Sequence, residues 1–315
     1  MNNHINKLVV HIDIDSPIKL FNFYKIKGIL YNQEELELFY KTAFERMFEL
    51  FDKLNIKVTF FVVGDELQSS EIIQGIIKNA HLLGHEIENH TYSHPFGLAY
   101  LSEERIIEEI VMCNQIIEKT IGESPIGFRS PGYSMNLKVI NVLEKLNFKY
   151  DTSGFWSIMN PLLKFSQNIL FKNGVNNGDF GGVSRKLLQK PYVPHSDNWL
   201  ISSNIKRDFL EIPLPRTNLF GMPFYNNFNL WAPVFYSNLM CKTINKDHII
   251  YLCHIIEFMD MTDLIPKELI LHPNIKTSAI KKINKTEKFI SNLSKRYEPI
   301  KTRDLISVCA RGSLK

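Results

Sequence analysis

The sequence lacks paired cysteines, long apolar runs and a recognisable secretion signal. Four cysteines are scattered among 315 residues without any C-x-x-C spacing, which indicates reduced thiols rather than a disulfide framework. No segment approaches the roughly eighteen consecutive apolar residues of a membrane-spanning helix. Residues 1–15 lack the apolar core and small-residue cleavage site of a secretory signal. We therefore expect a cytoplasmic protein, with at most peripheral contact at the inner face of the membrane.

Strong charge is also absent, since the formal net charge is only +4. Much of the lysine lies in residues 276–296, where Ile280, Ile283, Ile290 and Leu293 recur at helical spacing. This pattern predicts a helix with one solvated basic face, so we expect no nucleic-acid partner. The sequence leaves the oligomeric state open.

What the sequence does contain is a regular alternation of apolar strand patterns and amphipathic helix patterns. We expect strands at residues 7–14, 57–63, 85–89, 126–129, 148–151, 210–214 and 248–254, and helices at 34–54, 70–83, 103–121, 137–146, 276–296 and 303–309. Repeated units of this kind predict an α/β fold with a parallel sheet or barrel, whose catalytic loops gather at one end. Residues 154–206 are rich in Asn, Gly and Pro, and we expect a loop-rich insertion there within a single domain covering residues 1–315.

Residues 84–95, GHEIENHTYSHP, contain two histidines four positions apart. On a helical turn, His90 and His94 would face the same side and could hold one divalent cation. Further polar residues follow other predicted strands: Asp13 and Asp15 after the first, Arg129 after the fourth, and His254 at the end of the last. Because a parallel barrel brings such strand ends together, a metal site with two histidines and one carboxylate is predicted, which suits hydrolysis.

These motifs, in this order, resemble those of the polysaccharide deacetylases, carbohydrate esterase family 4. GHEIENHTYSH is similar to the family's GHEIGNHTxxH, with Glu88 in place of Gly. HIDIDSP resembles TFDDGP, FRSPGYS resembles the arginine-proline motif, and IIYLCHIIEF resembles the last strand with its histidine. The resemblance covers residues 7–309 and implies a distorted, incomplete (β/α)7-type barrel with a long insertion.

The resemblance also implies roles for individual residues. Asp15, His90 and His94 would bind the metal, most simply Zn²⁺, although Co²⁺, Ni²⁺ and Fe²⁺ accept the same ligands. Asp13 would be the general base, with Arg129 beside it, and His254 the general acid. Since Ile14 separates the two aspartates, their roles could be exchanged. The substrate and oxyanion would meet Gly132, Tyr133 and Asp151; Asp151 would also tune His254.

The function that follows is a metal-dependent N-deacetylase acting on an N-acylated sugar. The expected substrate is a cytosolic precursor of a surface glycan, carried on a nucleotide or a lipid. A deformylase, or another acyl-amide hydrolase on a lipid-linked amino sugar, uses the same chemistry and remains an alternative. A catalytically inert carbohydrate-binding protein is the alternative from a different class.

Overall fold

The computed structural model describes residues 6–24, 26–29, 31–159, 187–205, 207–218 and 220–312. The strands are β1 Lys7–Ile14, β2 Thr59–Val62, β3 Glu86–Asn89, β4 Gly127–Phe128, β5 Tyr150–Asp151, β6 Leu210–Glu211, β7 His248–His254 and β8 Glu298–Pro299. The α-helices are α1 Pro17–Tyr24, α2 Gln33–Lys53, α3 Gly64–Ser69, α4 Glu71–Leu82, α5 Glu103–Ile121, α6 Leu137–Lys145, α8 Asn226–Trp231, α9 Val234–Thr243, α10 Ala279–Ser294 and α11 Thr302–Gly312. Short 3-10 helices are η1 Leu98–Tyr100, η2 Pro131–Tyr133, η3 Ile255–Phe258 and η4 Lys267–Leu271.

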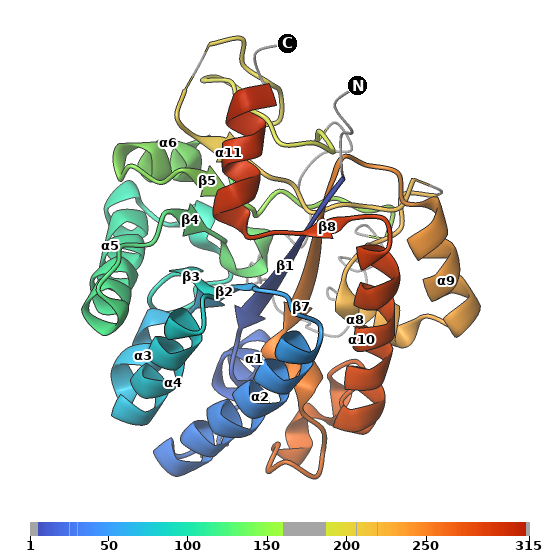
Figure 1. Ribbon diagram of the computed structural model, residues 1–315. Coiled ribbons are helices and arrows are strands. Elements are labelled where there is room, and N and C mark those ends of the chain that lie inside the picture. Colours follow the sequence, from blue (N-terminus) through green and yellow to red (C-terminus); the bar gives the residue numbers. More distant parts are fainter. Residues whose placement is uncertain are drawn as a thin grey trace.

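The strands form a half-barrel with the order β6-β5-β4-β3-β2-β1-β7, and β8 adds to one end of β1 (Figure 1). All of these strand pairs are parallel. The carboxyl ends of β1 and β7 point downward in Figure 1, whereas α11 lies at the opposite end. The predicted distorted (β/α)7-type barrel is confirmed.

The central strand β1 shows how the sequence separates the two faces of this sheet. Leu8, Val10, Ile12 and Ile14 belong to the core shared with α2 and α10, while Val9 belongs to the core inside the half-barrel. Successive side chains on a strand alternate between faces, so His11 and Asp13 point to the same interior as Val9. Burying each large aliphatic side chain stabilises this arrangement by about 1.5–3 kcal/mol.

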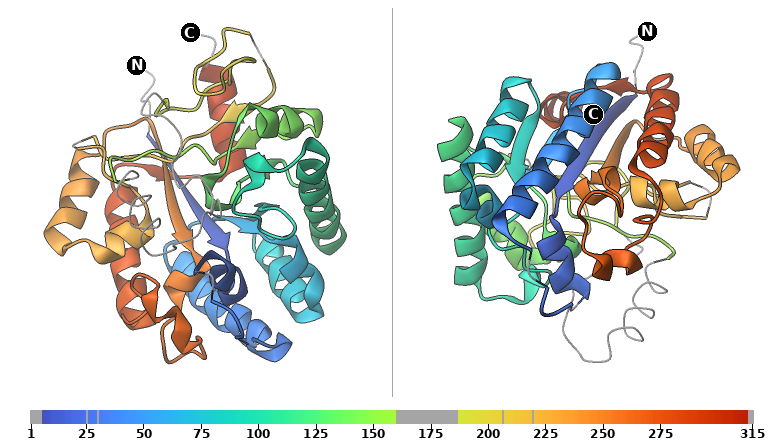
Figure 2. Two further views of the ribbon diagram at one scale, coloured as in Figure 1. Left: turned by 180° about the vertical axis from the view of Figure 1, so that it is seen from behind. Right: turned by 90° about the horizontal axis from the view of Figure 1, so that it is seen from below.

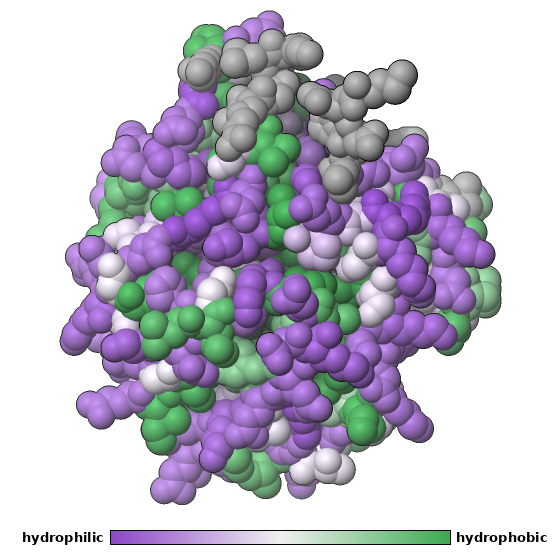
Figure 3. Space-filling view, viewed as in Figure 1, coloured by the Kyte–Doolittle hydropathy of each residue, from purple (hydrophilic) through white to green (hydrophobic). Residues whose placement is uncertain are grey.

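The outer helices carry the pattern expected of half-buried helices. α5 begins after Ser102, whose side chain accepts from the Arg105 N–H, and ends at Gly122 with a left-handed φ of 78°. Figure 2 shows the helices arranged around one side of the sheet from two further directions. Their exposed faces are mainly hydrophilic, with apolar side chains between them (Figure 3).

Several expectations need correction. α1, α3, α8, α9 and β8 were not predicted, and Ile280, expected on the apolar face of the last long helix, is 68% exposed. The four cysteines are free and buried. In the predicted insertion at 154–206, residues 160–186 and residue 206 lie outside the described residues, so the insertion and the single-domain boundary remain predictions. No described helix is both long and apolar enough to cross a membrane.

Candidate metal and acid–base site

Four strand ends meet at the carboxyl-terminal end of the half-barrel and bring the predicted site residues together. The parallel register sets Asp13 of β1 directly beside His254 of β7. β3 leads into His90, and Arg129 follows β4. Residues far apart in the sequence are thus gathered by sheet topology, as expected for a parallel α/β fold.

Asp15, His90 and His94 form a compact set of metal-ligating side chains. All three are buried, and one donor atom from each lies within 4.8 Å of the others. Asp15 Oδ1 is 3.2 Å from His90 Nε2 and 3.1 Å from His94 Nε2. Among the described residues, Asp15 Oδ1 and both ring nitrogens of His94 make no hydrogen bond of good geometry, although they are buried. Convergent donors that leave buried atoms unsatisfied fit a divalent cation.

The hydrogen bonding around His90 suits the same purpose. His90 Nδ1 donates to the Arg129 carbonyl oxygen at 2.7 Å, which leaves Nε2 to face Asp15. A histidine ligand is commonly oriented in this way by a carbonyl on its other nitrogen. Burial lowers the pKa of His94, which favours the neutral, ligating imidazole. Burial also disfavours the charged form of His90, but the nearby carboxylates of Asp15 and Asp13 outweigh burial and raise the pKa of His90. A metal cation at His90 would therefore compete with a proton.

The segment that carries the two histidines is a loop, so the expected helical turn is wrong. Thr91 has a φ of 68° and His94 a φ of 61°, both in the left-handed region. Asn89 Oδ1 accepts from the Thr91 N–H at 2.7 Å, and Glu109 of α5 accepts from both the N–H and the hydroxyl of Ser93. These contacts replace helical hydrogen bonds and hold the strained backbone. Asn89 and Glu109 are supports that the sequence pattern did not reveal.

Asp13 lies beside the metal-ligating set, within reach of two cationic groups. Arg129 Nε is 3.4 Å from Asp13 Oδ1, and His254 Nε2 is 3.9 Å from Asp13 Oδ2. Arg129 is fully buried, and its Nη2 donates to His11 Nδ1 at 2.5 Å. Burial and the Arg129 charge lower the pKa of His11, which is therefore a neutral acceptor. His11 thus acts as a hydrogen-bonded support of Arg129.

His254 has a different carboxylate partner from the expected one. Its Nδ1 lies 3.2 Å from Glu257 Oε1, and Glu257 is itself bound by the Asn226 amide at 2.6 Å. Burial opposes the charged imidazole, but Glu257 outweighs it, and the pKa of His254 rises to about 9. Asp151 instead accepts from the N–H and hydroxyl of Ser153. The expectation that Asp151 tunes the pKa of His254 is therefore wrong. Glu257, three residues after His254 in η3, has this role instead.

Replacing Glu257 by Gln is therefore expected to lower the pKa of His254. The carboxylate favours the protonated imidazole, so its loss moves the titration from about pH 9 towards the ordinary value near 6.5. An NMR titration of the His254 ring measures this shift. Asp151→Asn serves as the comparison and should leave the His254 titration close to wild type. An unchanged midpoint in Glu257→Gln, or an equal shift in both variants, would contradict the assignment.

The predicted oxyanion loop forms η2, where Gly132 and Tyr133 both have a φ of 57°. The Tyr133 N–H donates to the Ser130 carbonyl at 3.1 Å, so it is already engaged. The Tyr133 ring is buried and contacts Phe155 with centroids 5.1 Å apart. Tyr133 thus forms part of the wall of the half-barrel, and the Gly132 N–H is the remaining backbone donor of the predicted pair.

Glu88 lies inside the half-barrel, away from the metal-ligating atoms. Its Oε2 accepts from the N–H groups of Ile126 and Gly127 at 2.8 and 2.7 Å. Arg303 Nη2 approaches its other oxygen at 3.5 Å, and burial raises the pKa of Glu88 to about 8. β3 and β4 share only the Asn89–Phe128 pairing. The Glu88 carboxyl group therefore accepts from two backbone N–H groups at the start of β4 that have no partner in the short β3–β4 ladder.

Exchanging Glu88 for Gly, the residue of the resembling motif, should destabilise the fold without removing metal binding. Two inward backbone donors lose their acceptor, which costs about 1–3 kcal/mol of unfolding free energy per group left unsatisfied. Urea unfolding measures this loss, and Glu88→Gln, which keeps an acceptor oxygen at similar size, is the matched control. Equal stability of Glu88→Gly and wild type would show that water satisfies these donors.

Comparisons with known proteins agree with this geometry. Residues 36–150 match the family model described as polysaccharide deacetylase. Over 99 residues the chain is 35% identical to the uncharacterized protein YlxY of Bacillus subtilis, covering 31% of this chain and 30% of that protein. Over 106 residues it is 34% identical to a peptidoglycan-N-acetylglucosamine deacetylase of Bacillus cereus, covering 32% of this chain and 37% of the relative. The chain thus matches only about a third of the length of either relative.

A solved structure extends the similarity of fold to the whole chain. A candidate polysaccharide deacetylase from Mycobacterium smegmatis superposes with a TM-score of 0.62 at 14% identity, covering 100% of this chain and 94% of that one. At this identity the likeness concerns the fold alone. The half-barrel with its surrounding helices is therefore an architecture already seen in a solved structure.

Proposed function

We propose that this chain, whose residues 36–150 match the polysaccharide deacetylase family model, hydrolyses the N-acetyl amide of a sugar. The observation that carries this proposal is the placement of Asp13 and His254, 3.9 Å apart, beside the convergent set of Asp15, His90 and His94. An amide hydrolase needs an activated water, a base for its proton and an acid for the departing amine. The site offers one candidate group for each requirement.

Asp15, His90 and His94 would hold a divalent cation, with Zn²⁺ as the first candidate. Such a cation, when bound, lowers the pKa of water and polarises a carbonyl. Asp13 would accept the proton of the attacking water, oriented by Arg129 Nε at 3.4 Å. The distances favour this division of roles over the exchanged one, because Asp15 and not Asp13 lies between the two imidazoles.

His254 would supply the proton that the amine needs to leave. Its pKa of about 9 keeps the imidazole protonated at neutral pH, and Glu257 at 3.2 Å fixes the ring. The backbone N–H of Gly132 is the candidate donor to the developing oxyanion. The products are acetate and a free amino sugar.

For the substrate, we propose a precursor of a surface glycan, carried on a nucleotide or a lipid, and an intracellular site of action. The named Bacillus cereus relative is a deacetylase of peptidoglycan N-acetylglucosamine, which supports an N-acetylated sugar as the acyl substrate. Mass spectrometry of nucleotide-linked and lipid-linked N-acyl sugars after incubation with metal-loaded protein tests the proposal. Loss of an acetyl group is the expected result, whereas loss of a formyl group would indicate the deformylase alternative. No change in any N-acyl sugar, with full metal loading, would favour the inert carbohydrate-binding alternative.

A further inference from the structure

The surface over α8 and α9 exposes large apolar side chains. We define the α8–α9 patch as Phe220, Trp231, Val234, Phe235 and Leu239, whose exposed fractions range from 37% to 72%. α9 lies at the outer right-hand edge of the molecule in Figure 1, and apolar side chains are visible at that margin in Figure 3. Single exposed apolar residues are ordinary, but a group of this size on neighbouring elements marks an interaction surface.

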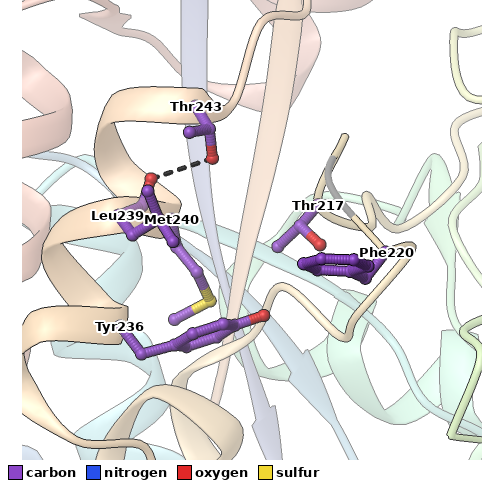
Figure 4. Close-up of a pocket in the computed structure, with 6 residues that line it drawn as sticks. All are labelled: Thr217, Phe220, Tyr236, Leu239, Met240 and Thr243. Carbon is purple, nitrogen blue, oxygen red and sulfur yellow. Dashed lines mark hydrogen bonds between the residues drawn. The ribbon is translucent and has the colours of Figure 1, made fainter.

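A small hollow adjoins the patch and is itself lined largely by apolar groups (Figure 4). It lies between α9 and the turn before Gly221 and is open to solvent. The lining residues are Thr217, Phe220, Tyr236, Leu239, Met240 and Thr243. Phe220 has a φ of 65°, in the left-handed region that a bulky side chain rarely adopts. The turn therefore holds the Phe220 ring outward at the cost of backbone strain, as functional segments often do.

The chain segment that forms the patch carries charged side chains of one sign. Residues 212–246 contain no Asp or Glu, but they contain Arg216, Lys242 and Lys246. Burial and the nearby Arg216 charge together lower the pKa of Lys246, so two cationic groups lie close to one another there. From α10, Lys285 Nζ donates to the Ala232 carbonyl at 2.5 Å and adds a further cation. The surroundings of the patch are thus complementary to an anionic partner.

From these observations we propose that the α8–α9 patch docks on the interfacial region of an anionic lipid bilayer. Trp and Phe side chains insert at the boundary of headgroups and acyl chains, while flanking Lys and Arg side chains contact lipid phosphates. A second copy of this chain fits less well. In a two-fold symmetric dimer the same patch meets itself, which would oppose Arg216, Lys242 and Lys246 to one another without a carboxylate between them.

The patch lies close to the site through α8. Asn226, the first residue of α8, binds Glu257 at 2.6 Å, and Glu257 in turn contacts His254. Trp231 at the far end of α8 is about 8 Å further along the helix axis, at 1.5 Å per residue. A membrane-docked enzyme could then reach the sugar of a lipid-linked substrate while the lipid stays in the bilayer. In this respect the inference rests on the proposed function and selects the lipid-linked substrate class.

Cosedimentation with vesicles tests the docking without any substrate. Wild-type protein should bind vesicles of phosphatidylcholine and phosphatidylglycerol, bind weakly to phosphatidylcholine alone, and lose binding as salt rises. Trp231→Ser with Phe235→Ser should weaken binding at least about tenfold, given the apolar area removed. The matched control is Ile72→Ser with Leu82→Ser on α4, whose side chains are comparably exposed, and it should bind as wild type does.

A second variant, Lys242→Gln with Lys246→Gln, retains the apolar side chains and should lose the preference for phosphatidylglycerol. The proposal is overturned if wild type ignores anionic vesicles, or if the Trp231→Ser, Phe235→Ser variant binds them as wild type does. A patch-dependent dimer in sedimentation, without vesicle binding, would also overturn it in favour of a second copy. Asp13→Asn should strongly reduce hydrolysis but leave vesicle binding intact, so failure of docking and failure of the proposed function are distinguishable.

Discussion

Replacing His94 by Ala is expected to abolish metal binding and to lower kcat/KM by about 10³-fold or more, because a catalytic cation contributes several kilocalories per mole. The remaining pair, Asp15 and His90, offers only two donors, whereas the wild-type set provides three within 4.8 Å. Metal content by mass spectrometry of the purified protein and acetate release from an N-acetyl sugar measure the two effects.

The control for this variant is His195→Ala, which removes a partly exposed histidine that lies 4.0 Å from Asp197 in the same loop. It should keep both metal content and activity. Retention of stoichiometric metal by His94→Ala would reject the ligand set, whatever the activity. Retention of activity after removal of the metal with a chelator would reject the metal-dependent mechanism independently of the ligand set.

Asp13→Asn should lower kcat by about 10²–10⁴-fold, the usual contribution of a general base, while metal content stays at the wild-type value. The amide is close in size to the carboxylate and can still meet Arg129 and His254, but it cannot accept the proton of water. Asp15→Asn is the decisive companion and should reduce metal content, because Asp15 Oδ1 lies next to both imidazoles. If Asp13→Asn loses the metal and Asp15→Asn keeps it, the two aspartates have the exchanged roles.

The bounds of a helix or strand could be predicted accurately where capping residues or a long apolar run mark its ends in the sequence. The predicted helix at 103–121 coincides with α5 because Ser102 and Gly122 fix its two ends within the sequence itself. The strand at 248–254 coincides with β7 because its apolar run is long and buried on both faces. α8 and α9 were missed because their patterns are irregular, with exposed Trp231 and Phe235 where a polar face would be expected.

The residues of the candidate site could be proposed from the sequence, but their surroundings could not. The parallel fold was enough to bring Asp13, Asp15, His90, Arg129 and His254 together. The conformation of the His90–His94 loop depends instead on Asn89 and on Glu109 from another helix, and no local pattern encodes that contact. Glu257 was missed for a related reason: the 3-10 turn η3 returns it to His254, whereas Asp151 on another strand was expected to be the partner.

The central position of β1 also has a consequence for the order in which the molecule folds. β1 pairs with β7 on one side and with β2 and β8 on the other, and His11 meets Thr302 across 291 positions of sequence. Such distant contacts carry a large loop-closure cost and slow the folding of a chain. We therefore expect the half from β1 to β5 to form early, and Asp13 to meet His254 only when β7 is added. On this order, the folding chain would gain its acid–base pair only at a late stage.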